Sequence, residues 1–210
     1  MNRKKSYEVI VVGAGHAGCE AALACARMGA RTALVTLHAN TIGLLSCNPA
    51  IGGVGKGQLV KEIDALGGQM GRATDACAIQ FRILNASKGA AVHSSRAQVD
   101  RKRFASYMRR VIKTQKGLTL YEAEVNGLLV KNGLVQGVKL AGAEQLLAKT
   151  VIVTPGTFLN GLIHIGMQSF PGGRIEEQES SSGLSACLRN LSFRLLRFKT
   201  GTCARLDGAS

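Results

Sequence analysis

Residues 8–20 read EVIVVGAGHAGCE, and the fold class follows from this stretch. The apolar, β-branched run Val9–Val12 predicts a strand that is buried on both faces. Gly13, Gly15 and Gly18 follow with the spacing G-x-G-x-x-G, and the alanine-rich residues after them predict a helix. A strand, a glycine turn and a helix in this order form the dinucleotide-binding fingerprint. The stretch therefore predicts an α/β fold with a nucleotide at the turn.

Each glycine has its own predicted role in this fingerprint. Gly13 permits the tight turn, Gly15 lets a pyrophosphate approach the backbone, and Gly18 lets the helix pack close to the strand. The helix, predicted over 17–28, offers unpaired N–H groups and the positive end of its dipole to the pyrophosphate. The alternative is a glycine-rich turn that binds no ligand.

The second predicted strand, Arg31–Thr36, departs from the usual fingerprint. Thr36 stands where an acidic residue normally binds the ribose hydroxyls. A hydroxyl can replace part of that contact, but the departure weakens the interpretation of the chain as a generic NAD-binding protein.

Composition restricts the class of protein. A chain of 210 residues holds one sizeable domain, and its net charge of +14 favours an anionic partner such as nucleic acid. A basic piece of a more balanced protein is the alternative. No apolar stretch is long enough to span a membrane, and the basic start leads into a strand rather than a signal peptide. None of the six cysteines forms C-x-x-C or has zinc spacing, so we expect a cytoplasmic protein with reduced thiols and no metal or membrane.

A second glycine loop follows in residues 46–68, SCNPAIGGVGKGQLVKEIDALGG. It is not a phosphate-binding P-loop, because Ala50 replaces the first glycine and Gly57 replaces the required Ser or Thr. Cys47 lies just before the glycines of this loop. Lys56 could stabilise its thiolate, and the alternative is a half-buried thiol without a function.

Apolar periodicity predicts two more helices. The first has Leu59, Ile63 and Leu66 on one face. The second, over 97–116, has an apolar stripe, and its remaining face is basic and either solvated or phosphate-binding. The small polar residues 85–89 between these helices suit a loop that faces a ligand. The stripe consists of Phe104, Met108, Val111 and Ile112.

Residues 119–150 change character and predict an antiparallel β-meander. Strand-like runs cover 125–130, 134–140 and 145–153, and Asn132-Gly133 is a strong hairpin signal between the first two. The last run ends at TPGT, residues 154–157, where a ligand can meet the edge of the sheet.

At this point the sequence resembles the MnmG (GidA) family of FAD-dependent tRNA wobble-uridine modification enzymes. The similar stretches keep the family's order over nearly the whole chain, and CNPAIGG (47–53) and FRILNASKG (81–89) are far more specific than the fingerprint. The others are GAGHAGCEAALACARMG (13–29), TPGTFLNGLIHIG (154–166) and RFKTGT (197–202).

The resemblance implies an FAD-binding Rossmann-like fold of the two-dinucleotide-binding-fold type with an inserted meander. Residues 1–158 would form the first part of the FAD domain, and 159–210 would begin the substrate and NAD-side region. Cys47 matches a cysteine that the family needs for activity. The implied FAD contacts are Gly13, Ala14, Gly15, His16, Ala17, Gly18, Val125 and Ser180.

The implied reaction forms 5-carboxymethylaminomethyl or aminomethyl on the wobble uridine (U34) of tRNA. NADH would be the reductant and methylene-tetrahydrofolate the one-carbon donor. The implied partners are tRNA and the GTPase MnmE, bound by a homodimer of the full-length protein.

Two departures from the family leave alternatives open. Cys203-Ala204 replaces the two prolines of the family's K-T-G-T-P-P-R, and family members are far longer than this chain. The alternatives are a small-molecule flavin oxidoreductase of the same fold and an inactive fragment. CNPAIGG and NASKG argue against the first of these.

Overall fold

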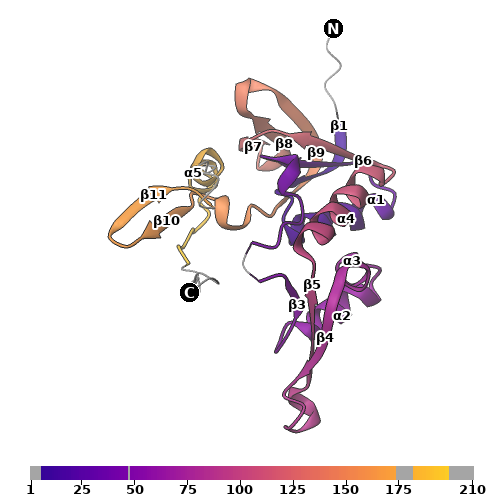
Figure 1. Cartoon of the computed structure of the whole chain (residues 1–210). Helices are drawn as coiled ribbons and strands as arrows, with labels where there is room; N and C mark the ends of the chain where they lie inside the picture. The colour runs from indigo at the N-terminus through magenta and orange to yellow at the C-terminus, as the bar shows by residue number, and fades with distance from the viewer. Residues whose placement is uncertain (1–5, 47, 174–181, 199–210) are drawn as a thin grey trace.

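The computed structural model describes residues 6–46, 48–173 and 182–198. Its largest sheet has six strands in the order β6-β2-β1-β9-β8-β7 (Figure 1). The first four strands of this order run parallel, and β8 and β7 add to them in antiparallel fashion. In the order of the sheet the strands are Leu118–Glu122, Thr32–Thr36, Ser6–Val12, Gln145–Val153, Leu134–Leu140 and Val125–Lys131.

Strand β1 lies near the middle of the sheet and contributes to the core on both faces. Successive side chains of a strand point to opposite faces, so its apolar run divides between two clusters. Val11 packs with the helices of one face, and Ile10 and Val12 pack with the meander and α5 on the other. The buried strand that the sequence predicts at 9–12 is confirmed.

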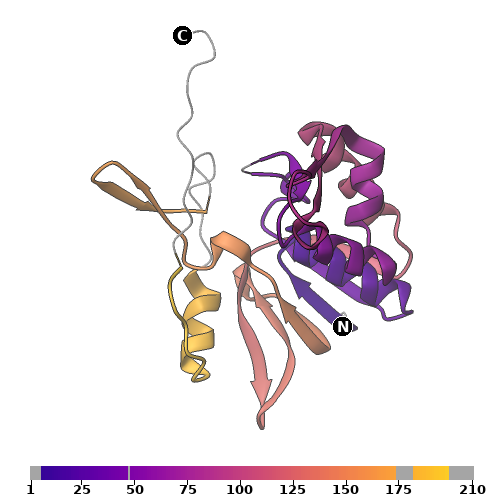
Figure 2. The ribbon, with the colours of Figure 1, turned by 90° about the horizontal axis from the view of Figure 1, so that it is seen from below.

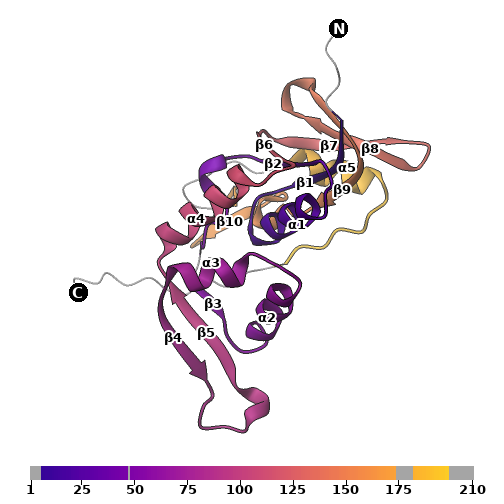
Figure 3. The ribbon, with the colours of Figure 1, turned by 90° about the vertical axis from the view of Figure 1, so that its right-hand side faces the viewer.

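Helices α1 (His16–Arg27) and α4 (Arg101–Thr114) cover the first face of the sheet (Figure 3). The predicted stripe of α4 is confirmed, because Phe104, Met108 and Ile112 are buried there. The predicted start of this helix at residue 97 is wrong. The Asp100 carboxylate accepts a hydrogen bond from the Arg103 N–H and caps the helix, and residues before it pair in a strand.

The meander is confirmed as β7, β8 and β9. Asn132 and Gly133 both have positive φ, 53° and 76°, as the predicted hairpin turn requires. The range predicted for the meander begins inside β6, which pairs with β2 in the parallel part of the sheet. Strand β9 joins the two parts, since it pairs in parallel with β1 and antiparallel with β8.

A second, three-stranded sheet of order β3-β5-β4 extends away from the first, with α2 and α3 beside it (Figures 1 and 3). The helix predicted after the second glycine loop is α2, but its apolar face is not buried. Leu59 and Leu66 are 57% and 90% exposed, because among the described residues no element covers that side. These elements are β3 (Ala50–Gly52), β4 (Ala78–Leu84), β5 (Ser94–Val99), α2 (Gly57–Ala65) and α3 (Met70–Cys77).

The Glu20 carboxylate fixes the start of α3 to helix α1. It accepts hydrogen bonds of 2.9 and 3.0 Å from the Gln69 N–H and of 2.6 Å from the Met70 N–H. These N–H groups open α3 and have no partner within that helix, so Glu20 caps it from a distance. Arg27, also on α1, donates to the Gly67 carbonyl of the same connection.

The last described elements are a hairpin of β10 (Leu162–Ile165) and β11 (Gln168–Pro171) and the helix α5 (Ser182–Asn190). The hairpin projects from the body, and α5 lies against β7 (Figure 2). Taken together, the mixed sheet with helices on it confirms the predicted α/β, Rossmann-like class. Within the described ranges, no helix has the length and apolar character needed to cross a membrane.

Candidate functional site

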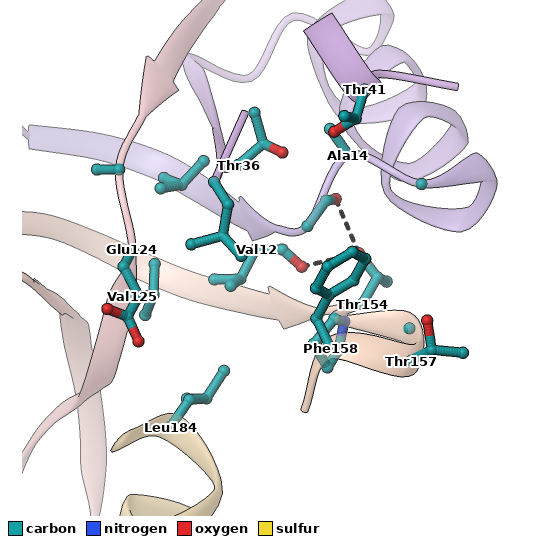
Figure 4. Close-up of a pocket in the computed structure, with 17 residues that line it drawn as sticks. Val12, Ala14, Thr36, Thr41, Glu124, Val125, Thr154, Thr157, Phe158 and Leu184 are labelled. Carbon is teal, nitrogen blue, oxygen red and sulfur yellow. Dashed lines mark hydrogen bonds between the residues drawn. The ribbon is translucent and has the colours of Figure 1, made fainter. Parts of the chain in front are cut away.

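A cavity of about 150 Å³ opens at the carboxyl ends of β1, β2 and β9 (Figure 4). This edge of a parallel sheet is where α/β folds bind ligands, because the loops there leave a crevice above the strands. The connection from β6 to β7 and the start of α5 close the cavity from the other side. Its lining residues are Val12–Gly15, Val35–Leu37, Thr41, Ala123–Val125, Thr154–Phe158 and Leu184.

Hydrogen bonds between strand ends hold the floor of the cavity. The Gly13 N–H donates to the Val35 carbonyl at 2.8 Å, and the Thr154 N–H donates to the Val12 carbonyl at 2.8 Å. The Thr154 hydroxyl lies 2.9 Å from the same Val12 oxygen and 3.1 Å from the Gly13 carbonyl oxygen. Three strands therefore end in one fixed arrangement, and the glycine turn has little freedom to move.

The three fingerprint glycines have different surroundings. A Cβ on Gly13, whose φ is +97°, would lie 2.3 Å from the Thr154 carbonyl oxygen. A Cβ on Gly18 would lie 1.7 Å from the Gly13 carbonyl oxygen, so the protein's own packing requires both glycines. A Cβ on Gly15 would meet nothing within 4 Å, although Gly15 lines the cavity. Gly15 therefore faces open space that a ligand can fill.

Helix α1 points its N-terminus at this open space. Gly15 is its N-cap and offers no side chain to the first N–H groups. Those groups and the helix dipole favour an anion, and a pyrophosphate meets both requirements. The residues present thus fit the diphosphate of a dinucleotide.

The predicted site residues fall into three groups: those that line the cavity, those that lie in α1 away from it, and those outside the described residues. Gly13, Ala14, Gly15 and Val125 line the cavity. His16, Ala17 and Gly18 belong to α1 and do not line it, and the His16 ring instead packs edge-on against Phe104, with centroids 5.9 Å apart. Cys47 and Ser180 lie outside the described residues.

The cavity also contains residues that the sequence did not single out. Thr154–Thr157 were expected at the sheet edge and do line it. Thr41 and Glu124 come from connections that are distant in sequence, and Leu184 comes from α5. Glu124 directly precedes Val125, and this adjacency is the signal that could have found it. The small polar loop 85–89 does not line this cavity, because it joins β4 to β5 in the second sheet.

Cys19 lies one turn into α1 and is fully buried. Burial raises the pKa of its thiol to about 12, and the nearby Glu20 charge acts in the same direction. Its Sγ donates to the Ala14 carbonyl at 3.4 Å. This thiol is structural, since a thiolate is scarcely populated at neutral pH.

The family model named glucose inhibited division protein A matches residues 8–210. The chain is 56% identical, over 205 residues, to the tRNA uridine 5-carboxymethylaminomethyl modification enzyme MnmG of Geobacter sulfurreducens. That match covers 98% of this chain and 32% of the relative. The chain therefore spans about a third of the length of the relatives it matches.

Solved structures give the same result. GidA of Aquifex aeolicus, in its form II crystal, superposes with a TM-score of 0.93 at 54% identity over 98% of this chain and 34% of that one. The GidA-related protein of Thermus thermophilus superposes with a TM-score of 0.67 at 22% identity. It covers 90% of this chain and 70% of that one, and shows likeness of fold alone.

Proposed function

The chain belongs to the glucose inhibited division protein A family, and on that basis we propose that it is the N-terminal part of an FAD-dependent enzyme that modifies the wobble uridine of tRNA. The relatives that it matches at more than 50% identity bear the name of that tRNA modification. The specific blocks around Cys47 and Asn85 support this function over a small-molecule flavin oxidoreductase.

The observation that carries the proposal is the open space at Gly15 beside the N-terminus of α1. The backbone of Gly13–Gly15 would hold the FAD pyrophosphate there, with Gly18 keeping the helix close to the strand. Val125 and Ser180 would add contacts to the cofactor. When bound, FAD supplies the redox chemistry of the reaction.

We assign Cys47 the part of an acid–base group or of a nucleophile toward the uracil ring. NADH as reductant and methylene-tetrahydrofolate as one-carbon donor are proposed as co-substrates of the complete enzyme. A homodimer that binds the GTPase MnmE is its proposed assembly.

Helix α4 supports RNA as the substrate. Five of its basic side chains are exposed and its sequence contains no acidic residue, so the exposed side of the helix is strongly positive. Several groups also bind the protein itself. The Asp100 carboxylate caps the helix, and the Arg109 guanidinium donates to the Asn40 carbonyl at 2.7 Å. The Arg103 guanidinium donates to the Ala76 carbonyl at 3.2 Å, and the Arg110 guanidinium lies over the Tyr107 ring. The exposed cations are Arg101, Lys102, Arg103, Arg110 and Lys113.

A chimera tests the proposed function. Residues 1–210 would replace the corresponding third of A. aeolicus GidA, and the purified chimera would be assayed for bound flavin and for modified wobble uridine in unmodified tRNA with MnmE present. We expect bound flavin and turnover, and Cys47→Ser should lower turnover by orders of magnitude while flavin stays bound. A chimera that folds but binds no flavin contradicts the cofactor, and full activity of the Cys47→Ser chimera contradicts the role of the thiol.

Residues 1–210 alone should bind FAD weakly and should not turn over. The flavin ring would lack the part of its pocket that the rest of the family's chain supplies. Stoichiometric, tight FAD together with turnover by this chain would contradict that expectation.

A further inference from the structure

Strand β2 ends at Thr36, where the usual fingerprint has an acidic residue. An acidic residue, Glu124, lies instead on the connection from β6 to β7. The Ala123 N–H donates to the Thr36 carbonyl at 2.8 Å, which continues the β2–β6 pairing beyond the strands. The next residue, Glu124, is held on its other side, because its carbonyl accepts from the Ala141 N–H at 2.9 Å. The backbone of Glu124 is therefore fixed where its side chain lines the cavity.

The cavity has two chemically different ends (Figure 4). Ala14 and Thr41 lie at one end, beside the N-terminus of α1, where a diphosphate fits. Val125, Glu124 and Leu184 lie at the other end, and Thr36 lies between them. An extended nucleotide with its phosphates at Ala14 would place its base beside Val125.

The end of the cavity at Val125 is an apolar slot. Val125 and Leu184 belong to one apolar cluster with Val12 and Val35, which also line the cavity, and each of the four is at least nine-tenths buried. Such a slot accepts the faces of a flat aromatic ring. The polar edge of such a ring then needs a polar group of the protein at the edge of the slot.

Glu124 is that polar group. Of the described residues that line the cavity, it has the only ionisable side chain. A carboxylate can only accept hydrogen bonds, so it favours a ring edge that donates and disfavours one that presents a carbonyl oxygen. At the 6-position adenine presents an amino group that donates, whereas hypoxanthine presents an oxo group that only accepts, and the N1–H beside that oxo group points in a different direction.

We propose that Glu124 is the base-selecting residue of the nucleotide pocket, and that its carboxylate accepts a hydrogen bond from the 6-amino group of adenine. The proposal rests on the proposed function, in which the adenosine half of FAD occupies this cavity. Glu124 acts there as a specificity residue. It takes no part in the redox chemistry.

The ratio of ADP affinity to IDP affinity tests this role. Both nucleotides carry the same diphosphate, so any change in repulsion between that diphosphate and the Glu124 charge cancels in the ratio. Glutamine at this position can accept from an amino group through its oxygen and donate to an oxo group through its nitrogen. Glu124→Gln should therefore remove the preference rather than weaken both ligands equally.

The experiment is calorimetric titration of ADP, IDP and FAD, at up to millimolar ligand, into the 210-residue chain. We expect the wild type to prefer ADP over IDP by about tenfold or more, which is the effect of one hydrogen bond to a charged group. In Glu124→Gln the ratio should fall to within about twofold of unity. Glu122→Gln is the matched control, since Glu122 ends β6, is exposed and does not line the cavity.

The outcomes separate this inference from the proposed function. If the wild-type chain binds neither ADP nor FAD, the base-selecting inference fails, and the cofactor proposal fails with it only if the chimera also holds no flavin. If they bind and Glu124→Gln keeps the wild-type ratio, or if the Glu122 control loses it equally, the base-selecting role fails while the cofactor proposal stands. Circular dichroism of each variant establishes that the fold is intact.

Discussion

A Cβ on Gly18 would lie 1.7 Å from the carbonyl oxygen of Gly13, so helix α1 touches the glycine turn with no room for any side chain. Gly15, between them in sequence, has a φ of −69° and nothing within 4 Å of its Cβ position. One motif thus combines glycines that the fold requires with a glycine that the fold does not require, and that we propose the ligand does.

This difference predicts opposite effects of substitution. Gly18→Ala should destabilise the chain by about 3 kcal/mol or more, because the added methyl group collides with backbone that cannot move aside. Gly15→Val should lower the stability by no more than about 1 kcal/mol, because valine is a poorer N-cap than glycine, and should abolish the binding of FAD and ADP. Urea denaturation and calorimetric titration measure the two effects. Normal nucleotide affinity in folded Gly15→Val would falsify the assignment of the pyrophosphate site.

Glu20→Gln should destabilise the chain by about 1–3 kcal/mol, because the carboxylate accepts charge-assisted hydrogen bonds from the N–H groups that open α3 and a neutral amide accepts them less strongly. Urea denaturation measures the change. The control is Glu62→Gln, an exposed position of α2. Equal denaturation midpoints for the two variants would show that the remote cap contributes nothing.

Cys19 should resist alkylation in the native chain. Its thiol has a pKa of about 12 against an ordinary 9.0, so the native thiolate fraction at pH 8 is roughly a thousandfold below that of the unfolded chain. Iodoacetamide labelling followed by mass spectrometry, in buffer and in urea, measures the ratio. Equal rates in the two conditions would refute the buried position of this thiol.

The raised pKa of the Cys19 thiol also makes the stability of the chain fall as the pH rises above 9. The native state holds the Cys19 proton more tightly than the unfolded state, so the contribution is fully present below pH 9 and is lost as the pH rises toward 12. Cys19→Ala should show a flatter decline of stability over that range, which urea denaturation at a series of pH values would measure. Parallel declines in the two proteins would contradict the shift.

The outer face of α4 should bind RNA through phosphates. Lys102→Glu combined with Lys113→Glu should weaken tRNA binding and reduce its dependence on salt, by about one unit of the log–log slope for each phosphate that the variant no longer neutralises. The control pair is Lys139→Glu with Lys149→Glu, two exposed positions on the meander. Filter binding at several salt concentrations is the measurement, and an equal effect of both pairs would mean that only net charge matters.

The sequence was a sufficient guide to the glycine turn and to the meander. Both depend on short-range rules: a buried strand, a turn that needs glycine and a helix in immediate succession, and an Asn132-Gly133 hairpin between alternating strands. Local rules failed at residues 97–99, which the sequence pattern predicts to be helical. These residues pair with β4 and β3 instead, and Asp100 caps α4, so the helix begins only at Arg101. They also failed to show that Leu59 and Leu66 face outward, because periodicity says that a face is apolar but not what covers it.

The fold class, the family and the glycine turn at one end of the cavity could thus be predicted from the amino-acid sequence, since these reside in contiguous residues. The composition of the other end of the cavity, around Glu124 and Val125, emerged only from the folded chain. Strand pairing brings Ala123, the neighbour of Glu124, beside Thr36, and the packing of α5 brings Leu184 into the same apolar cluster as Val12. Such contacts join residues that are far apart in the sequence. They arise from sheet pairing and burial rather than from any local pattern.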